Sequence, residues 1–382
     1  MKLGTIAKVQ GGYAFKSQEF QSEGVPIIRI GNLDGKNVEI DNDVCYPIAF
    51  WDKHPEFRVE KNNILIAMSG ATVGKIGLYK SDNKALLNQR VCILKPDENA
   101  VTNEYLYFFC MSPTFKNSIK ENAFGCAQPN ISATQICDFE INVPDIETQK
   151  RWVSQLRKIK NIIDKREQEL VELDNLIKSR FVEMFGEPEE NTFGWDKMPL
   201  ANVIINANNG MARRGNDEEG NIVMRLVELQ DGYIDYSNPN RIVLSDNEKK
   251  RYLLKDKDFL FARVNGNPDN VGRCAVFHDI GEDAYHNDHI IRVHFNEGVL
   301  DGVFASALLN SYYGKKQLKS QIKTSAGQYT VSQDGIGAIV AILPPMELQE
   351  QFATFVEQVD KLKFFTINYT KLLHKGVNSF GN

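Results

Sequence analysis

The feature that most constrains this chain is an internal repeat in its sequence. Segment 128–149 contains Gln, Ser, Pro and Gln at four positions, and the same four residue types recur 200 positions later in segment 328–349. In each case the last two residues form a Pro-x-x-x-x-Gln motif. Because a repeat of this length determines the architecture, we expect two similar halves related by a pseudo-twofold internal repeat.

Shorter matches continue the repeat upstream in the same order, with small shifts at the expected loops. The matching pairs are Leu3–Ile6 with Leu200–Val203, Ile28–Ile30 with Met224–Leu226, Asn63–Ala67 with Asp258–Ala262, and Asn88 with Asn287. One such pair would carry little weight. Several pairs in one order indicate a duplication.

The first part of each half contains short apolar runs separated by Gly, Asn and Asp, which is typical of strands and turns. The runs are VPIIRI, NILIAM, KIGLY and RVCILKP in the first half, and IVMRLVEL, DFLFAR, RCAVF and HIIRVHF in the second. Helical stretches are expected at 103–121 and 302–323. Each first part is therefore predicted to be a mixed, largely β domain.

The second part of each half is a long helix. Segment 147–185 contains no Pro or Gly, and its apolar residues recur at alternating steps of three and four, the period of a coiled-coil seam: Leu156, Ile159, Ile163, Leu170, Leu173, Ile177 and Met184. The second half repeats the stripe with Phe352, Phe355, Val359, Leu362, Tyr369 and Leu373. An apolar stripe needs a partner, so the two helices are expected to pack on each other as an antiparallel coiled coil.

These patterns predict an α+β fold with four parts. The expected boundaries are a mixed, largely β domain at 1–145, a long helix at 146–187, a second mixed domain at 188–345 and a second long helix at 346–382.

Composition excludes several classes. No run approaches the roughly 18 apolar residues of a membrane helix, and the start of the chain lacks a signal-peptide core. The six cysteines form no CxxC pair, so we expect reduced thiols in a cytoplasmic protein rather than disulfides or zinc. The net charge of −5 is unusual for a DNA-binding protein acting alone, so any nucleic-acid contact needs local basic patches or a basic partner.

The order of domain, long helix, domain and long helix resembles the specificity subunit of type I restriction–modification systems. The segments that carry the resemblance are Gly24–Leu33, Asn62–Ile66 with Ser69-Gly70, and the stretches 132–149 and 332–349. The resemblance covers essentially the whole chain.

This resemblance implies a non-catalytic subunit. Each domain would read one half of a bipartite site on double-stranded DNA, and the helix pair would fix the gap and dock two methyltransferase subunits. Restriction/translocase subunits would join through the complex. S-adenosylmethionine, ATP and Mg²⁺ would belong to those partners, with no cofactor or metal in this chain.

Motifs for chemistry within the chain are weak. Gly70-Ala-Thr-Val-Gly74-Lys75 has one residue too few between its glycines for a Walker A loop and lacks the following Ser or Thr, so it is interpreted as a turn. His286 and His289 are better explained as polar loop residues than as metal ligands. No methyltransferase Asn/Asp-Pro-Pro-aromatic motif is found in the sequence.

Candidate DNA contacts are polar residues beside the matched turns, since Arg reads guanine, Asn and Gln read adenine, and Lys and Ser mostly hold phosphates. In the first half they are Lys16, Ser69, Thr72, Lys75, Asn88, Gln89, Arg90 and Gln128; in the second they are Arg213, Arg214, Arg263, Asn265, Asn267, Arg273, Asn287, His289 and Gln328. Arg213, Arg214 and Arg263 stand out, because loop arginines among Asn and Gly are expected to have few internal partners. Arg29 and Arg225 recur in both halves, where a structural ion pair and a DNA contact both fit.

The sequence thus predicts a DNA-recognition and assembly subunit. Two alternatives remain at this stage: a coiled-coil adaptor without base-specific readout, and a stand-alone DNA-modifying enzyme. The enzyme would need an acidic metal cluster or a cofactor loop. The adaptor would not need two elaborate domains.

Overall fold

A computed structural model describes residues 1–40, 44–123, 129–325 and 327–378. The chain divides into two compact units. Unit 1 comprises Met1–Gln168 and Ile367–Asn382, and unit 2 comprises Glu169–Thr366. The division passes through both long helices, so each unit holds one segment of each.

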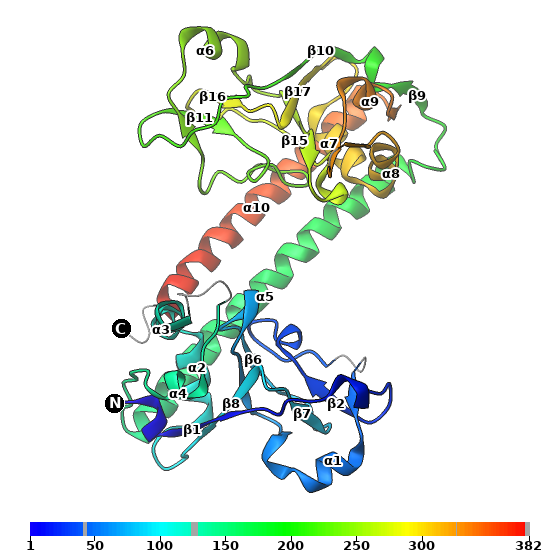
Figure 1. Ribbon diagram of the computed structural model, residues 1–382. Coiled ribbons are helices and arrows are strands. Elements are labelled where there is room, and N and C mark those ends of the chain that lie inside the picture. The colour runs from blue at the N-terminus through cyan, green and yellow to red at the C-terminus, as the bar shows by residue number, and fades with distance from the viewer. Residues whose placement is uncertain (41–43, 124–128, 326, 379–382) are drawn as a thin grey trace. The chain divides into compact units, whose positions relative to one another are not determined.

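The described part of unit 1 contains two four-stranded sheets (Figure 1). The first is antiparallel in the order β1 (Ala7–Gly11), β8 (Val91–Pro96), β5 (Ile64–Ala67) and β6 (Ile76–Leu78). The second has the order β3 (Cys45–Tyr46), β2 (Val25–Ile28), β7 (Ala85–Leu87) and β4 (Arg58–Val59), with β2 and β7 parallel. The predicted strands at VPIIRI, NILIAM, KIGLY and RVCILKP are confirmed.

Strand β5 is apolar throughout because both of its faces are covered. Ile64 and Ile66 belong to a core that includes residues of the helices α2 (Asn103–Met111), α3 (Pro113–Ala123) and α4 (Ala133–Cys137). Leu65 and Ala67 belong to a second core with residues of β2 and β7. The remaining helices of the unit's first segment are α1 (Ile48–Lys53) and the 3-10 turns η1 (Leu3–Thr5), η2 (Ser17–Glu19), η3 (Ile30–Asn32), η4 (Pro55–Phe57) and η5 (Gly70–Thr72).

The single helix expected at 103–121 is in fact two helices, α2 and α3, separated by Ser112. The hydroxyl of Ser112 accepts a hydrogen bond from the backbone N–H of Phe115 at 3.3 Å, so it begins a new helix. The same break occurs in unit 2 at Ser311, between α7 (Gly302–Asn310) and α8 (Tyr312–Ser320). Its hydroxyl accepts from the N–H of Gly314 at 3.3 Å.

Unit 2 has a four-stranded antiparallel sheet of the same form, in the order β10 (Ile204–Asn209), β17 (Ile290–Phe295), β13 (Phe259–Ala262) and β15 (Cys274–Val276). Unit 2 also has a three-stranded sheet of β12 (Arg241–Ile242), β11 (Asn221–Met224) and β16 (Ala284–His286), in which β11 and β16 are parallel. A second three-stranded sheet consists of β14 (Val264–Asn265), β19 (Gln328–Thr330) and β18 (Lys323–Ser325). Strands β20 (Val340–Leu343) and β9 (Asp196–Pro199) form a pair. The shorter helical elements are α6 (Asp246–Tyr252), α9 (Gln333–Gly337), η6 (Leu200–Asn202) and η7 (Pro268–Asn270).

The long helices are α5 (Ile146–Phe185), with 40 residues, and α10 (Met346–Asn378), with 33. The seam residues predicted on α5 are all buried or half-buried. In unit 2, Phe181 of α5 lies 5.5 Å from Phe352 of α10 between ring centroids, and Asp174 forms a 2.6 Å ion pair with Lys363. The later of the two α5 residues contacts the earlier of the two α10 residues, so within unit 2 the two helices are antiparallel.

The stripe predicted on α10 is wrong at two positions. Leu362 and Tyr369 are 56% and 46% exposed, whereas Thr366 and Thr370 are buried. After Val359 the buried face continues through Lys363, four residues on, rather than through Leu362. Either a three-residue step to Leu362 or a four-residue step to Lys363 can continue the buried face from Val359. The apolar pattern alone favoured Leu362, which is the exposed position.

The repeated Pro-x-x-x-x-Gln motif performs one structural task in each unit. Gln149 is fully buried; its amide donates to the carbonyls of Ala100 (3.0 Å) and Pro144 (2.8 Å), and its carbonyl accepts from the N–H of Thr102 (2.8 Å). Thr102 is the N-cap of α2. Gln349 makes the same three bonds to Val299, Pro344 and Asp301, the N-cap of α7. The first turn of each long helix therefore carries a glutamine that binds the N-cap of a neighbouring helix.

The described cysteines are free thiols, as predicted, and burial raises the pKa of Cys92 to about 12. Across the described ranges, no helix combines the length and apolar character that crossing a membrane requires.

Candidate nucleic-acid interface

In unit 1 three segments that are distant in sequence meet at one place. The N–H of Gln89, in the turn between β7 and β8, donates to the carbonyl of Tyr13 at 2.8 Å. On the other side of this turn, Met68 N–H donates to the carbonyl of Arg90 at 2.8 Å. The turn is thus held between the end of β5 and the loop after β1, which carries Lys16.

A hollow opens where these segments meet. Its polar lining comes from Ser69, Gln89, Arg90, Asn130 and Ser132, over an apolar floor of Met68, Ile131 and Ala133. Ser69 Oγ in this lining, and Thr72 Oγ1 three residues further along the chain, are buried without a hydrogen-bond partner in the described structure. The hollow therefore gathers three predicted residues from two sequence-distant segments.

The predicted cations of unit 1 differ in their pairing. Lys75 and Arg90 are exposed, and within the described residues neither forms an ion pair. Lys16 is also exposed, with Glu19 at 3.7 Å. The remaining first-half candidate, Gln128, lies outside the described residues.

Unit 2 has an equivalent turn that is held by the same backbone hydrogen bonds. Asp288 N–H donates to the carbonyl of Met211 at 2.9 Å, as Gln89 does to Tyr13, and Arg263 N–H donates to the carbonyl of His289 at 2.7 Å, as Met68 does to Arg90. Arg214 follows Met211 by three residues, as Lys16 follows Tyr13. The structure thereby brings together Arg214, Arg263 and His289 around Asp288.

The expectation that the loop arginines of unit 2 have few internal partners is wrong. Arg214 donates to Asp288 Oδ1 at 2.6 Å, and Arg263 donates to the Asp288 carbonyl at 3.0 Å. Arg213 donates to the carbonyl of Val243 and to Glu248 Oε2, the latter at 3.1 Å. The acidic partners Asp288 and Glu248 are distant in sequence from these arginines, so the local Asn- and Gly-rich sequence did not predict them. Whether these arginines contact DNA stays a prediction.

Comparison with known proteins finds similarity to type I specificity subunits. The domain described as "Type I restriction modification DNA specificity domain" matches residues 1–175. The type I restriction enzyme StySPI specificity subunit of Salmonella potsdam is 24% identical over 99% of this chain and 83% of its own length, and the EcoKI specificity subunit of Escherichia coli (strain K12) is 21% identical over the same shares. Residues 1–175 therefore match a type I DNA specificity domain, and nearly the whole chain is similar to type I specificity subunits.

Two solved structures support this fold. The S subunit of the type I restriction–modification system from M. genitalium matches with a TM-score of 0.53 at 15% identity, over 99% of this chain and 93% of that one. A chain from a study of complex assembly in a type I system matches with a TM-score of 0.54 at 14% identity.

Several of the predicted asparagines bind their own turns. The side-chain oxygens of Asn88 and Asn287 each accept from a backbone N–H two residues later, at 3.1 Å in both cases. Asn265 and Asn267 do the same at 2.9 and 3.0 Å. Their acceptor oxygens are therefore partly occupied by Asx turns, and these residues shape the loops of the chain.

The last two candidates of unit 2 lie at its other turns and strands. Arg273 donates to the side-chain oxygen of Gln230 at 3.2 Å, and Gln328 is exposed on β19. Asp288 was missed, because the sequence search favoured cations and amides. Its position next to Asn287, in the segment that matches Asn88-Gln89-Arg90, could have revealed it.

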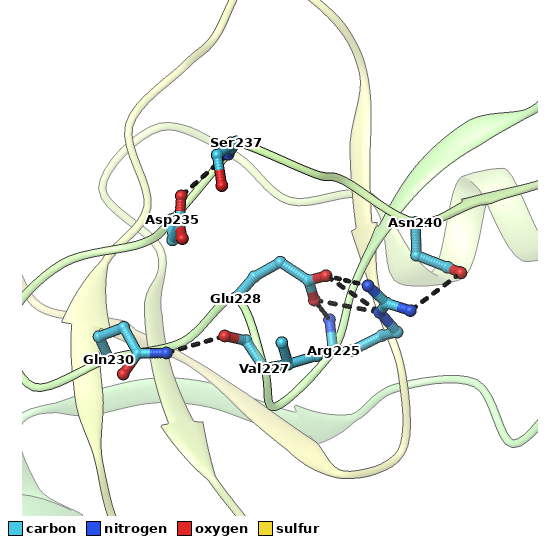
Figure 2. Close-up of polar contacts among 7 residues, drawn as sticks. All are labelled: Arg225, Val227, Glu228, Gln230, Asp235, Ser237 and Asn240. Carbon is cyan, nitrogen blue, oxygen red and sulfur yellow. Dashed lines mark hydrogen bonds and ion pairs between the residues drawn. The ribbon is translucent and has the colours of Figure 1, made fainter. Parts of the chain in front are cut away.

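Arg225 holds a buried carboxylate in unit 2 (Figure 2). Glu228 is 3% exposed and accepts from the Arg225 backbone N–H at 2.7 Å and from the guanidinium Nε at 3.0 Å, and Asn240 accepts from the same guanidinium at 3.3 Å. In unit 1 the equivalent position to Glu228 is Asn32, which accepts from Arg29 N–H at 2.8 Å. The ion-pair interpretation therefore fits Arg225.

His286 is not a loop residue, contrary to the sequence interpretation. It ends β16, is fully buried, and its Nδ1–H donates to the carbonyl of Tyr252 at 3.2 Å. No group of three potential ligands for a metal occurs among the residues with described positions. Burial, which disfavours the charged ring, lowers the pKa of His286 to about 4, and Arg292 adds to the effect.

The low pKa of His286 predicts a pH-dependent stability. An unfolded histidine has a pKa near 6.5, so the unfolded chain binds an extra proton between pH 6.5 and 4. Stability from the neutral ring is complete above pH 6.5 and is lost as the pH falls toward 4. The free energy of unfolding should be lower by about 2 kcal/mol at pH 5 than at pH 7, measured by urea titration.

The matched variant is His286→Leu, because unit 1 carries Leu87 at the equivalent strand position. It should remove most of this pH dependence. The exposed His278→Leu should leave it unchanged. A pH dependence that persists in His286→Leu would mean that other groups cause it.

Proposed function

We propose that this chain is a non-catalytic DNA-recognition subunit that reads a bipartite target, one half-site with each unit. The observation that carries the proposal is that the two polar surfaces share one backbone scaffold and differ in side chains. Gln89 and Arg90 in unit 1 stand where Asp288 and His289 stand in unit 2. A common frame with different chemistry suits two readers of different sequences.

The proposal extends to the rest of the chain. Domains 1–145 and 188–345 are the two readers, arising from an internal duplication. Segments 146–187 and 346–382 pair as an antiparallel coiled coil that fixes the gap between half-sites. The opposite direction of the contacts in unit 2 between Phe181 and Phe352, and between Asp174 and Lys363, supports this pairing.

The helix α10 also has a surface suited to partners. Leu362, Phe364 and Phe365 in unit 2 are 56%, 63% and 69% exposed, and Leu372 in unit 1 is 65% exposed. Large exposed apolar side chains on one helix are typical of a protein interface. We propose that two methyltransferase subunits dock here, bringing S-adenosylmethionine, and that restriction subunits bring ATP and Mg²⁺ chemistry. Such partners also supply positive charge that a chain with net charge −5 lacks.

A methylation map tests the proposal. The chain is co-expressed with the methyltransferase genes of its own locus in a host without DNA methylation, and modified adenines are located by sequencing. We expect a split motif with a constant unread gap. No motif, or one short continuous motif, would contradict the proposal and favour the adaptor.

A further inference from the structure

We propose that Arg214 and Asp288 together read one G·C base pair in the half-site assigned to unit 2. Arg214 would donate to O6 and N7 of guanine, and Asp288 would accept from N4 of the paired cytosine. This inference rests on the proposed function and adds the identity of one base pair.

The two side chains form one exposed unit. Arg214 Nη2 lies 2.6 Å from Asp288 Oδ1, and the side chains are 52% and 27% exposed. Arg214 Nη1 also donates to the carbonyl of Ala212 at 2.9 Å, and Nη2 lies 3.0 Å from His289 Nε2, so the guanidinium is held at three points. A guanidinium fixed in this way retains further N–H donors for a ligand.

The turn that carries Asp288 is fixed from three sides. Arg263 donates to the Asp288 carbonyl at 3.0 Å, and the Asp288 N–H donates to Met211 at 2.9 Å. Next to it, Asn287 is 5% exposed and its N–H donates to the carbonyl of Met224 at 3.0 Å. Such a turn presents its carboxylate in one position, which precise base recognition requires.

The carboxylate decides what this surface can bind. A phosphate near Asp288 would be repelled, so the pair is poorly suited to a backbone contact. In the major groove, however, an acidic side chain can accept from the amino group of cytosine, and arginine forms two bonds with guanine. One G·C pair satisfies both side chains, whereas the thymine of an A·T pair offers Arg214 only O4 and a methyl group.

Unit 1 offers an internal contrast. Gln89 occupies the place of Asp288, and Lys16 the place of Arg214. An amide and a lysine cannot form this acid–guanidinium pair, so the first half-site carries no such requirement at the equivalent position. The two half-sites should therefore differ in their chemistry at this point.

The test compares methylation motifs of the wild-type complex and of Asp288→Asn and Arg214→Lys. Asp288→Asn keeps the shape but loses the charge, and Arg214→Lys keeps the charge but loses the fork. We expect each to relax one G·C position in one half-site, with its preference falling on the order of 5- to 150-fold, while the other half-site is unchanged. The matched control is Glu297→Gln, which breaks an exposed 2.8 Å ion pair with Lys257 beyond the opposite end of β17.

The outcomes separate the two proposals. If the wild type gives no split motif, the proposed function fails. If it gives a split motif that Asp288→Asn and Arg214→Lys leave intact, or that they relax at an A·T pair, only this inference is overturned. If a variant complex no longer methylates, its binding is measured instead, on duplexes in which each base pair of the half-site is changed in turn. A G·C preference equal to that of the wild type then overturns the inference.

Discussion

Replacing Gln149 with Met is expected to lower the free energy of unfolding of unit 1 by about 3 kcal/mol. Methionine has a similar volume, so the change mainly removes hydrogen bonds. Gln149 is 0% exposed and satisfies the N–H of Thr102 and the carbonyls of Ala100 and Pro144. Each of these half-buried backbone groups would lose its hydrogen bond to Gln149.

The site-specific readout is hydrogen exchange at the Thr102 amide, which should become faster together with the amides of the first turn of α2. Urea unfolding gives the overall change. Gln155→Met is the matched control, because it makes the same substitution at an exposed position of the same helix. Thr102 exchange that stays at the wild-type rate in Gln149→Met would show that Gln149 does not hold this N-cap.

Gln349→Met is the equivalent change in unit 2, where Asp301 takes the place of Thr102. There the N-cap side chain is a carboxylate that itself accepts from Val303 and Phe304 N–H groups at 2.8 and 2.9 Å. The cap of α7 is therefore supported by more bonds of its own. A smaller increase in exchange is expected at Asp301 than at Thr102.

The sequence was sufficient for the strands because their signals are local. Runs such as NILIAM and DFLFAR are apolar on both faces, and the structure covers both faces of β5 and β13. The long helices were also predictable, since 40 residues without Pro or Gly leave few other conformations. The register of the α10 stripe was less predictable, because Leu362 and Lys363 both fit a step from Val359.

The candidate site was only partly predictable, for a different reason. The segments that match in sequence lie at turns that make the same backbone hydrogen bonds in each unit. It could not show that Glu248 would bind Arg213, or that His286 would be buried at the end of β16. These facts depend on which distant residues the fold brings to each turn. Asp288 belongs to the same class, since its role appears only beside Arg214.

The double substitution Arg214→Ala with Arg263→Ala is expected to abolish recognition of the half-site read by unit 2. Arg214 loses its forked donor, and Asp288 loses both the ion pair and the bond to its carbonyl. Binding to the full target should weaken by about 3 kcal/mol, roughly a 100-fold rise in Kd. Duplexes with a scrambled second half-site should then bind the variant complex as well as the intact target does.

The design separates base readout from loss of charge. Arg241→Ala is the matched control: it removes a guanidinium in unit 2 whose bonds to Glu282 at 2.6 and 2.9 Å suit a structural role. This control should retain discrimination at both half-sites. If the double variant still rejects a scrambled second half-site, then Arg214 and Arg263 do not read it, and the side chains of another surface of unit 2 must.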